Sequence, residues 1–211
     1  MIPHPTTVLV IGKPDEHREE LVNHFIADAL KKNKETLYIT VDKDPRDVIN
    51  GLGNLVNIDE HIKNKKIHFI DCYSAARHKE KEDDVISLIH PRDLRKVHKL
   101  TLEKLSKLEK PERVVVDTLS GLSRFNTPAM IESFIDVTIG GLKKNGATVL
   151  LLVDEDFHPT YKADLEVLTD MTLRLHEIKN KTMISLYGLV NGVLVQRQMK
   201  KDEFFEQYFN N

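Results

Sequence analysis

The chain has 211 residues, of which 40% are apolar and 30% are charged, values typical of globular proteins. Its 31 Lys and Arg residues nearly balance 33 Asp and Glu residues, so the charge gives no reason to expect a nucleic-acid partner. No apolar run reaches the roughly 18 residues that a membrane span needs. The lone cysteine, Cys72, excludes an intramolecular disulfide and fits the reducing cytoplasm, and the length predicts one domain over residues 1–211.

The N-terminal part of the chain predicts a strand, a tight turn and a helix. An apolar run over 7–11 predicts a buried strand, which Gly12 and Pro14 interrupt. An amphipathic helix over 15–32 follows, with Asp15 as its expected N-cap. Many α/β proteins bind a phosphate at such a place, because the first N–H groups of the helix have no partner within it.

Strands and helices continue to alternate beyond this unit. Four further apolar runs predict strands, at 36–41, 66–70, 113–116 and 148–153. Amphipathic segments predict helices between them, at 46–55, 92–108 and 128–144, and the polar residues 73–90 predict a solvated loop. Period-two alternation around turn residues predicts two or three antiparallel strands, at 165–175, 183–189 and 193–198. The aromatic-rich residues 201–209 predict a last helix packed on the core.

The turn at Gly12 carries the main resemblance of the chain. It resembles the phosphate loop of the KaiC-like branch of the RecA-superfamily ATPases, Gly-x-Pro-Gly-Ser-Gly-Lys-Thr-Thr-Leu-x-x-x-Phe. Aligned without a gap, the matching residues are Gly12, Pro14, Leu21 and Phe25. The resemblance implies a RecA-like three-layer α/β fold, with a mostly parallel central sheet, antiparallel C-terminal strands and helices on both faces. It also implies an archaeal-type protein that assembles edge to edge.

Six consecutive residues depart from this pattern. The residues Gly, Ser, Gly, Lys, Thr and Thr of the loop are replaced by Asp15, Glu16, His17, Arg18, Glu19 and Glu20. The glycines allow the backbone to approach phosphate oxygens closely, and side chains in their place obstruct that approach. Arg18 keeps a positive charge on a bulkier head, while Glu19 replaces the hydroxyl that holds magnesium. Together with Lys13, the segment is either a self-capped helix start without a ligand or a divergent nucleotide site.

Two later strand ends also resemble motifs of these ATPases. Asp42 and Lys43 stand where KaiC-like relatives have an acidic pair, and the resemblance implies that one member of the pair is the catalytic base. Asp117 closes an apolar strand, as does the aspartate that orders magnesium in the second ATPase motif. An aspartate in such a position is also a common cap for the next helix. The basic hairpin end that contacts the nucleotide of a neighbouring subunit in the family is not seen, since 185–188 is Ser-Leu-Tyr-Gly.

Four apolar strands end in an aspartate, namely Asp42, Asp71, Asp117 and Asp154. Because the carboxyl ends of parallel strands meet at one edge, the sequence predicts an acidic cleft there, with Lys13, Lys43 and Arg18 as counter-charges. Three interpretations stay open. The aspartates cap the segments that follow them, they form a salt-bridged network with these cations, or they bind magnesium, for which Asp117 is the candidate ligand.

These features favour a domain that has kept a KaiC-like fold and lost its phosphate loop. Such a pseudo-ATPase would act in regulation or signal transduction, through a protein partner or further copies of itself, and would need no cofactor. The alternative is a divergent nucleotide-binding protein or weak ATPase that uses ATP and magnesium. It would have Arg18 in place of the lysine, Asp117 to order the metal and Asp42 to polarise water. A magnesium-dependent enzyme with another substrate is a third hypothesis.

Overall fold

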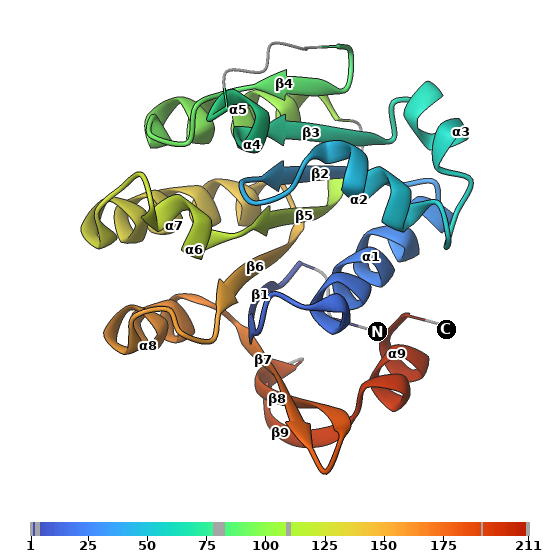
Figure 1. Ribbon diagram of the computed structural model, residues 1–211, viewed down its shortest axis with the longest axis vertical. Helices are drawn as coiled ribbons and strands as arrows, with labels where there is room; N and C mark the ends of the chain where they lie inside the picture. Colours follow the sequence, from blue (N-terminus) through green and yellow to red (C-terminus); the bar gives the residue numbers. More distant parts are fainter. Residues whose placement is uncertain (1, 3–4, 78–82, 109–110, 191, 210–211) are drawn as a thin grey trace.

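The computed structural model describes residue 2 and the ranges 5–77, 83–108, 111–190 and 192–209. These residues form a nine-stranded sheet. Its strands are, in chain order, β1 (Thr7–Gly12), β2 (Glu35–Thr40), β3 (Ile67–Asp71), β4 (Ile86–Leu88), β5 (Pro111–Asp117), β6 (Thr148–Asp154), β7 (Met171–Ile178), β8 (Lys181–Val190) and β9 (Val193–Lys200). Their spatial order is β4-β3-β2-β5-β6-β1-β7-β8-β9, from top to bottom in Figure 1.

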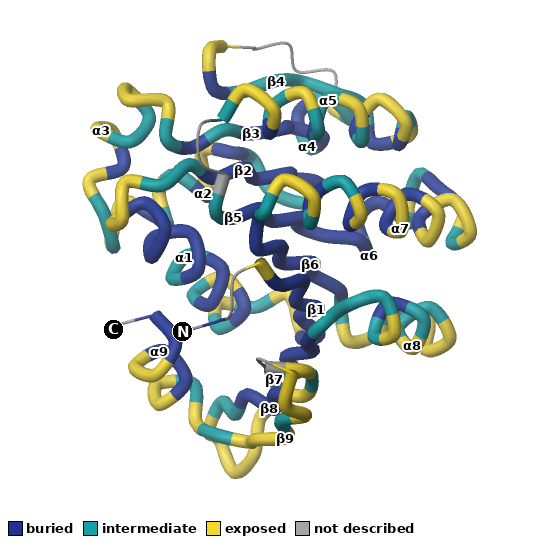
Figure 2. Tube along the Cα trace, turned by 180° about the vertical axis from the view of Figure 1, so that it is seen from behind, coloured by how far each residue is buried: buried dark blue, intermediate teal, exposed yellow. Residues whose placement is uncertain are grey.

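Helices cover both faces of the sheet. One face carries α1 (Glu16–Lys31), α2 (Pro45–Leu52), α3 (Ile58–Lys63) and α9 (Lys201–Phe209). The other face carries α4 (Cys72–Ala75), α5 (Leu94–Lys107), α6 (Leu119–Ser123), α7 (Pro128–Lys144) and α8 (Pro159–Leu168). An apolar cluster lies under each helix layer, and Figure 2 shows the central strands buried between them.

The pairing of the strands confirms the predicted mostly parallel α/β sheet with antiparallel C-terminal strands. Neighbouring strands from β4 to β7 are parallel, whereas β8 and β9 are added antiparallel. β1 is buried along its whole length, because helices cover it on both sides. Its alternate residues Val8 and Leu9 belong to different clusters, as the two-residue period of a strand requires.

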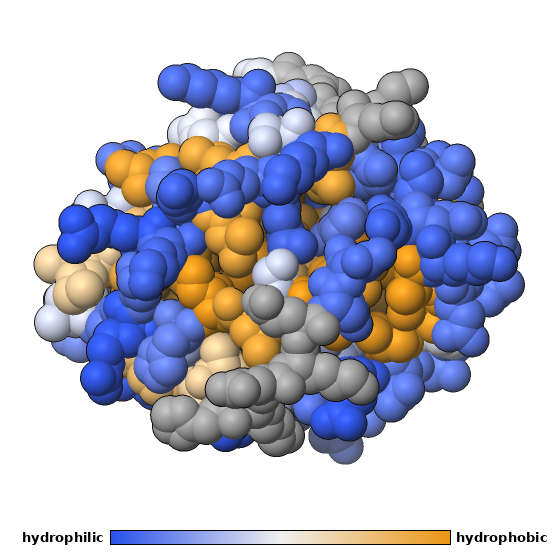
Figure 3. Space-filling view, turned by 90° about the horizontal axis from the view of Figure 1, so that it is seen from above, coloured by the Kyte–Doolittle hydropathy of each residue, from blue (hydrophilic) through white to orange (hydrophobic). Residues whose placement is uncertain are grey.

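The prediction of one solvated loop over 73–90 is wrong. α4 follows β3 directly, and β4 then pairs parallel with β3 at the edge of the sheet. β4 is only three residues long and half-buried, so it offers too little sequence to display a periodic pattern. Residues 78–82 of the predicted loop lie outside the described residues. Figure 3, a view onto this end of the molecule, shows apolar side chains at the surface between hydrophilic ones.

The prediction that 165–175 is an antiparallel strand is correct only for its second part. Residues 165–168 belong to α8, whereas β7 pairs antiparallel with β8 on one side and parallel with β1 on the other. α8 is a crossover helix, and a crossover of this kind returns the chain parallel to its starting direction.

The hairpin turn predicted at Asn180 is confirmed. Lys179 and Asn180 have φ of 50° and 59°, as a type I′ turn requires.

The aromatic side chains of α9 pack against α1 and the sheet. Phe204, Phe205, Tyr208 and Phe209 are all buried. The His24 ring of α1 lies 4.6 Å from the ring of Phe205, so α9 covers the outer side of α1. These aromatic residues are part of the core, as the sequence predicts. Among the described residues, no helix combines the length and apolar content that crossing a membrane requires.

Candidate functional site

In the turn between β1 and α1, the side chain of Asp15 caps the start of the helix. One carboxylate oxygen of Asp15 accepts hydrogen bonds from the N–H groups of His17 and Arg18, each at 3.1 Å. Asp15 is therefore the N-cap that the sequence predicts. These N–H groups are among those that a bound phosphate accepts from at a helix N-terminus. The Asp15 carboxylate accepts these hydrogen bonds instead. The neighbouring Lys13 is exposed.

Arg18 is held by two acceptors at the edge of the sheet. Its Nη1 donates to Asp154 Oδ1 at 2.6 Å and to the carbonyl oxygen of Gly12 at 3.2 Å. The register of the sheet explains this geometry, because Gly12 of β1 lies directly opposite Asp154 of β6. The side chain of Arg18 is only 6% exposed. The residue that aligns with the phosphate-binding lysine is thus engaged with a carboxylate of its own chain.

A small polar pocket lies beside Arg18, between α1, α2 and the ends of β2 and β5. Its volume is about 290 Å³, just below the range of roughly 300–1,000 Å³ that is usual for small-molecule sites. The pocket is lined by Arg18, Glu19, Val22, Asn23, Tyr38, Lys43, Asp47, Val48, Gly51, Asp117 and Leu152. The structure thus brings together four of the predicted residues. Arg18 and Glu19 come from the phosphate-loop segment, and Lys43 and Asp117 come from later strand ends.

Asp117 is engaged with a tyrosine that the sequence did not single out. The Tyr38 hydroxyl donates to Asp117 Oδ2 at 2.5 Å, and both side chains are buried. Burial raises the pKa of Asp117, although the hydrogen bond from Tyr38 and the charges of Lys43 and Arg18 act in the opposite direction. Burial also raises the pKa of Tyr38 well above its ordinary value. Tyr38 could have been suspected, because a tyrosine in a buried strand usually finds a polar partner.

Asp42 and Lys43, which align with the acidic pair of the family, contact different neighbours. Lys43 forms a salt bridge with Glu19 of α1, with nitrogen and oxygen 2.5 Å apart. Asp42 instead accepts a hydrogen bond from the Thr118 hydroxyl at 2.6 Å and pairs with Arg124. It packs so closely on α6 that a Cβ added at Gly121 would lie 2.5 Å from its Oδ2 atom. Asp42 therefore does not line the pocket beside Arg18.

The four strand-end aspartates do not share one cleft. Asp71 caps α4 by accepting from the Ser74 N–H at 2.8 Å, as the capping interpretation predicts. Asp154 pairs with Arg18, which is one link of the predicted salt-bridged network. Asp42 and Asp117 have the separate partners described above. Among the described residues, no group of three or more His, Cys, Asp or Glu side chains is placed to hold a metal ion.

Comparison with known proteins relates this arrangement to a family. A KaiC-like protein from the hyperthermophilic archaeon Pyrococcus horikoshii OT3 has a similar solved structure, with a TM-score of 0.72 at 14% sequence identity. The match covers 93% of this chain and 85% of that chain, and it shows that the two share a KaiC-like RecA fold. No protein of curated function matches the sequence. A family model described as the KaiC ATPase matches residues 1–200, and the chain therefore belongs to the KaiC ATPase family.

Proposed function

We propose that this chain is a KaiC-family domain that does not hydrolyse ATP and instead acts by binding protein chains, in a regulatory role. The observation that carries the proposal is the engagement of Asp15 and Arg18 within the chain. The Asp15 carboxylate accepts from the N–H groups at the start of α1, and Arg18 pairs with Asp154. A triphosphate would have to displace both interactions before it could bind there.

Charge adds a second obstacle to a triphosphate. The N-cap and first two turns of α1 hold four carboxylates, at Asp15, Glu16, Glu19 and Glu20. Of these, Asp15 caps the helix start and Glu19 lines the pocket beside Arg18, so a triphosphate there would meet like charges, which repel strongly in a partly desolvated site. Glu19 also stands in place of the hydroxyl that the family motif uses for magnesium. These residues do not fit a magnesium–triphosphate complex, so we assign them a structural role.

The pocket beside Arg18 supports the same conclusion. Asp117, the expected magnesium-ordering residue, is buried and hydrogen-bonded to Tyr38. Asp42, in the place of the catalytic base, is paired with Arg124 and lies outside the pocket. An in-line attack on a phosphate needs a base positioned beside the attacking water. We also propose a cytoplasmic location, since the chain has a single cysteine, Cys72, which is free and buried.

The experiment compares the wild type with a variant whose residues 15–20 are replaced by Gly-Ser-Gly-Lys-Thr-Thr. We expect the wild type neither to bind nor to hydrolyse ATP with magnesium at millimolar concentration. The replaced loop should gain magnesium-dependent ATP binding, because it restores the glycines, lysine and hydroxyl of the motif. Lys13→Ala in the wild type is the control for a change of charge beside the loop.

One result would support the alternative function, a divergent nucleotide-binding protein or weak ATPase. In that case the wild type would hydrolyse ATP, and both Arg18→Ala and Asp117→Ala would abolish the activity. Circular dichroism of the two variants would establish that they remain folded. Hydrolysis that Lys13→Ala leaves unchanged and these two variants remove would overturn our proposal.

A further inference from the structure

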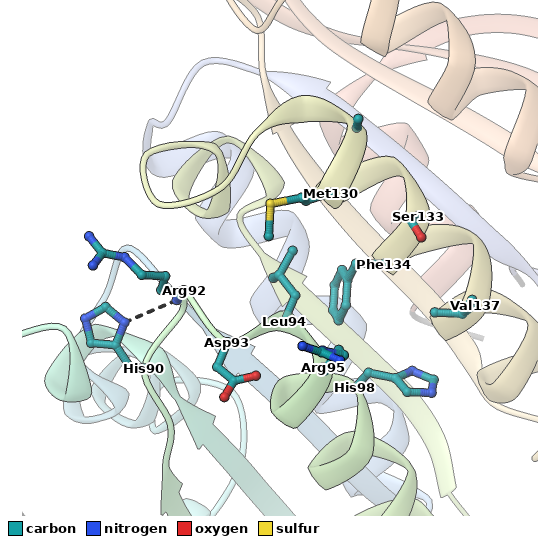
Figure 4. Close-up of a pocket in the computed structure, with 11 residues that line it drawn as sticks. His90, Arg92, Asp93, Leu94, Arg95, His98, Met130, Ser133, Phe134 and Val137 are labelled. Atoms are coloured by element: carbon teal, nitrogen blue, oxygen red, sulfur yellow. Dashed lines mark hydrogen bonds between the residues drawn. The ribbon is translucent and has the colours of Figure 1, made fainter.

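A large open groove lies on the opposite face of the sheet from α1, between the N-terminal halves of α5 and α7. Its volume is about 1090 Å³, just above the range of roughly 300–1,000 Å³ that is usual for small-molecule sites. Figure 4 shows Leu94 of α5 and Met130 and Phe134 of α7 pointing into the space between the two helices. Met130 and Val137 are 48% and 52% exposed, although both are apolar. The size and the exposed apolar side chains favour a peptide segment as the occupant.

The two helices run parallel and approach each other beyond the groove. His98 of α5 lies 3.1 Å from the Thr138 hydroxyl of α7. One turn further along, Leu102 packs so closely on Gly141 that a Cβ added at this glycine would lie 2.7 Å from the leucine side chain. Because these contacts advance together along both helices, the N-terminal ends of α5 and α7 lie at the same end of the groove.

The charged residues that line the groove are mostly basic. Arg92 and Arg95 both line it, and neither guanidinium forms an ion pair with another residue in the described part of the chain. Asp93 is the one acid among the described lining residues. Its carboxylate already accepts a hydrogen bond from the N–H of Lys96 at 3.1 Å and pairs with the ammonium of the same residue at 3.2 Å. Two unpaired positive charges therefore remain beside the apolar side chains.

The residues of α7 do not offset this positive charge. Glu132 lines a separate small pocket toward α8, and Asp136 does not line the groove. The N-terminal end of α7 adds to the positive potential, because the helix dipole is positive there. Its N-cap, Thr127, makes no side-chain capping hydrogen bond within the described chain, so an acceptor from a partner would not displace one. Both helices thus favour a negatively charged partner.

We propose that this groove binds an acidic amphipathic helix of another protein. Apolar side chains on one face of that helix pack on Leu94, Met130 and Val137, and carboxylates beside them pair with Arg92 and Arg95. A helix suits the groove better than an extended strand, because the walls are helices that hydrogen-bond their own backbones and leave a strand few partners. This inference rests on the proposed function, since it names the class of the protein partner.

The first test selects binders from a phage library of amphipathic helices, each held folded within a helical hairpin. Apolar residues occupy positions i, i+3, i+4 and i+7, and the flanking positions draw equally on Glu, Lys and Ser. The wild type should enrich helices rich in Glu, and Val137→Asp should not retain them. Val167→Asp is the matched control that should retain them, because Val167 on α8 is 85% exposed and lies outside the groove. Enrichment of Lys, or of helices that Val137→Asp still binds, would overturn the proposal.

The second test measures the dissociation constant of the most enriched helix by fluorescence anisotropy. Arg92→Glu with Arg95→Glu should weaken binding about tenfold or more, because it places like charges opposite the carboxylates of the helix. Lys13→Glu with Lys63→Glu makes the same change of charge on exposed residues outside the groove, and it should leave the affinity nearly unchanged. An equal loss in the two double variants, with both folded by circular dichroism, would overturn the proposal.

The alternative occupant of an apolar groove with a basic border is an anionic lipid. Saturable binding of myristate that Val137→Asp removes, with no helix enriched, would assign the groove to a lipid and overturn the proposal. ATP binding by the wild type would contradict the proposed function, whereas an enriched acidic helix would still support the inference about the groove. A wild type that binds neither the helices nor ATP overturns the inference and leaves the loss of nucleotide binding standing.

Discussion

Arg18 in the first turn of α1 and Asp154 at the end of β6 form a salt bridge, with nitrogen and oxygen 2.6 Å apart. It joins the start of a helix to the edge of the sheet at the place that aligns with the phosphate loop. A residue in the position of the phosphate-binding lysine thus serves the stability of the fold.

Arg18→Ala should lower the free energy of unfolding by about 2–3 kcal/mol, the cost of losing hydrogen bonds to a charged partner. The loss follows because Asp154 and the Gly12 carbonyl are both left without this donor. Arg18→Lys should lose less, since it keeps the charge but cannot reproduce the guanidinium geometry. Urea unfolding provides the measurement, with exposed Lys13→Ala as the control. Equal stability of Arg18→Ala and the wild type would show that the pair contributes nothing.

Asp15→Ala should cost about 1 kcal/mol, because it removes the cap from two N–H groups of α1. Asp15→Asn should keep most of the stability, since an asparagine oxygen can accept the same hydrogen bonds. Glu16→Ala, an exposed neighbour in the same turn, is the control for the loss of a negative charge near the helix dipole. Thermal unfolding followed by circular dichroism ranks the three variants. A larger loss for Glu16→Ala than for Asp15→Ala would contradict the assigned cap.

Asp117 should make stability depend on pH in an unusual direction. Its pKa is raised by burial, so the folded state favours the protonated form. The contribution of Asp117 is greatest below the ordinary carboxyl pKa and is lost as the pH rises through the folded value. Asp117→Asn removes this penalty while it keeps an acceptor for Tyr38. Urea unfolding should therefore show the variant gaining stability over the wild type as the pH rises above the ordinary carboxyl pKa of about 4. A difference that stays constant as the pH rises would contradict the assignment.

His24 should weaken the docking of α9 in acid. Burial against the aromatic rings of α9 lowers its pKa, and Lys31 and Lys201 add to this effect while Glu20 opposes it. The neutral ring stabilises the fold above the ordinary histidine pKa, and this contribution is lost as the pH falls through the lowered value. Hydrogen exchange of the α9 amides should therefore quicken in mild acid. His24→Phe should remove the dependence, and acid-induced exchange that persists in this variant would place its cause elsewhere.

The features that the sequence predicts correctly are those that depend on residues close together in the chain. The cap by Asp15 follows from its position before the first helical turn, and the buried strands follow from continuous apolar runs. Local patterns also led to an error, because only Thr169 and Asp170 separate the apolar end of α8 from β7. A short apolar segment does not by itself distinguish a helix end from a strand.

The contacts of the site could not be predicted from the sequence, because they join distant segments. Arg18 and Asp154 are 136 residues apart and meet only because β1 lies beside β6 in a particular register. Tyr38 appeared in the sequence as one more residue of a buried strand, and its partner Asp117 lies on the neighbouring strand β5. The common edge of the sheet was predicted correctly, but the direction of each carboxylate depends on packing that no local pattern reports.

The central claim is that side chains of this protein occupy the place where the aligned motif binds a triphosphate. Equilibrium dialysis of the wild type against labelled ATP with magnesium tests it most directly. We predict equal total ATP on both sides of the membrane up to millimolar concentration, because none is retained by the protein. Saturable, magnesium-dependent retention of one ATP per chain would contradict the account.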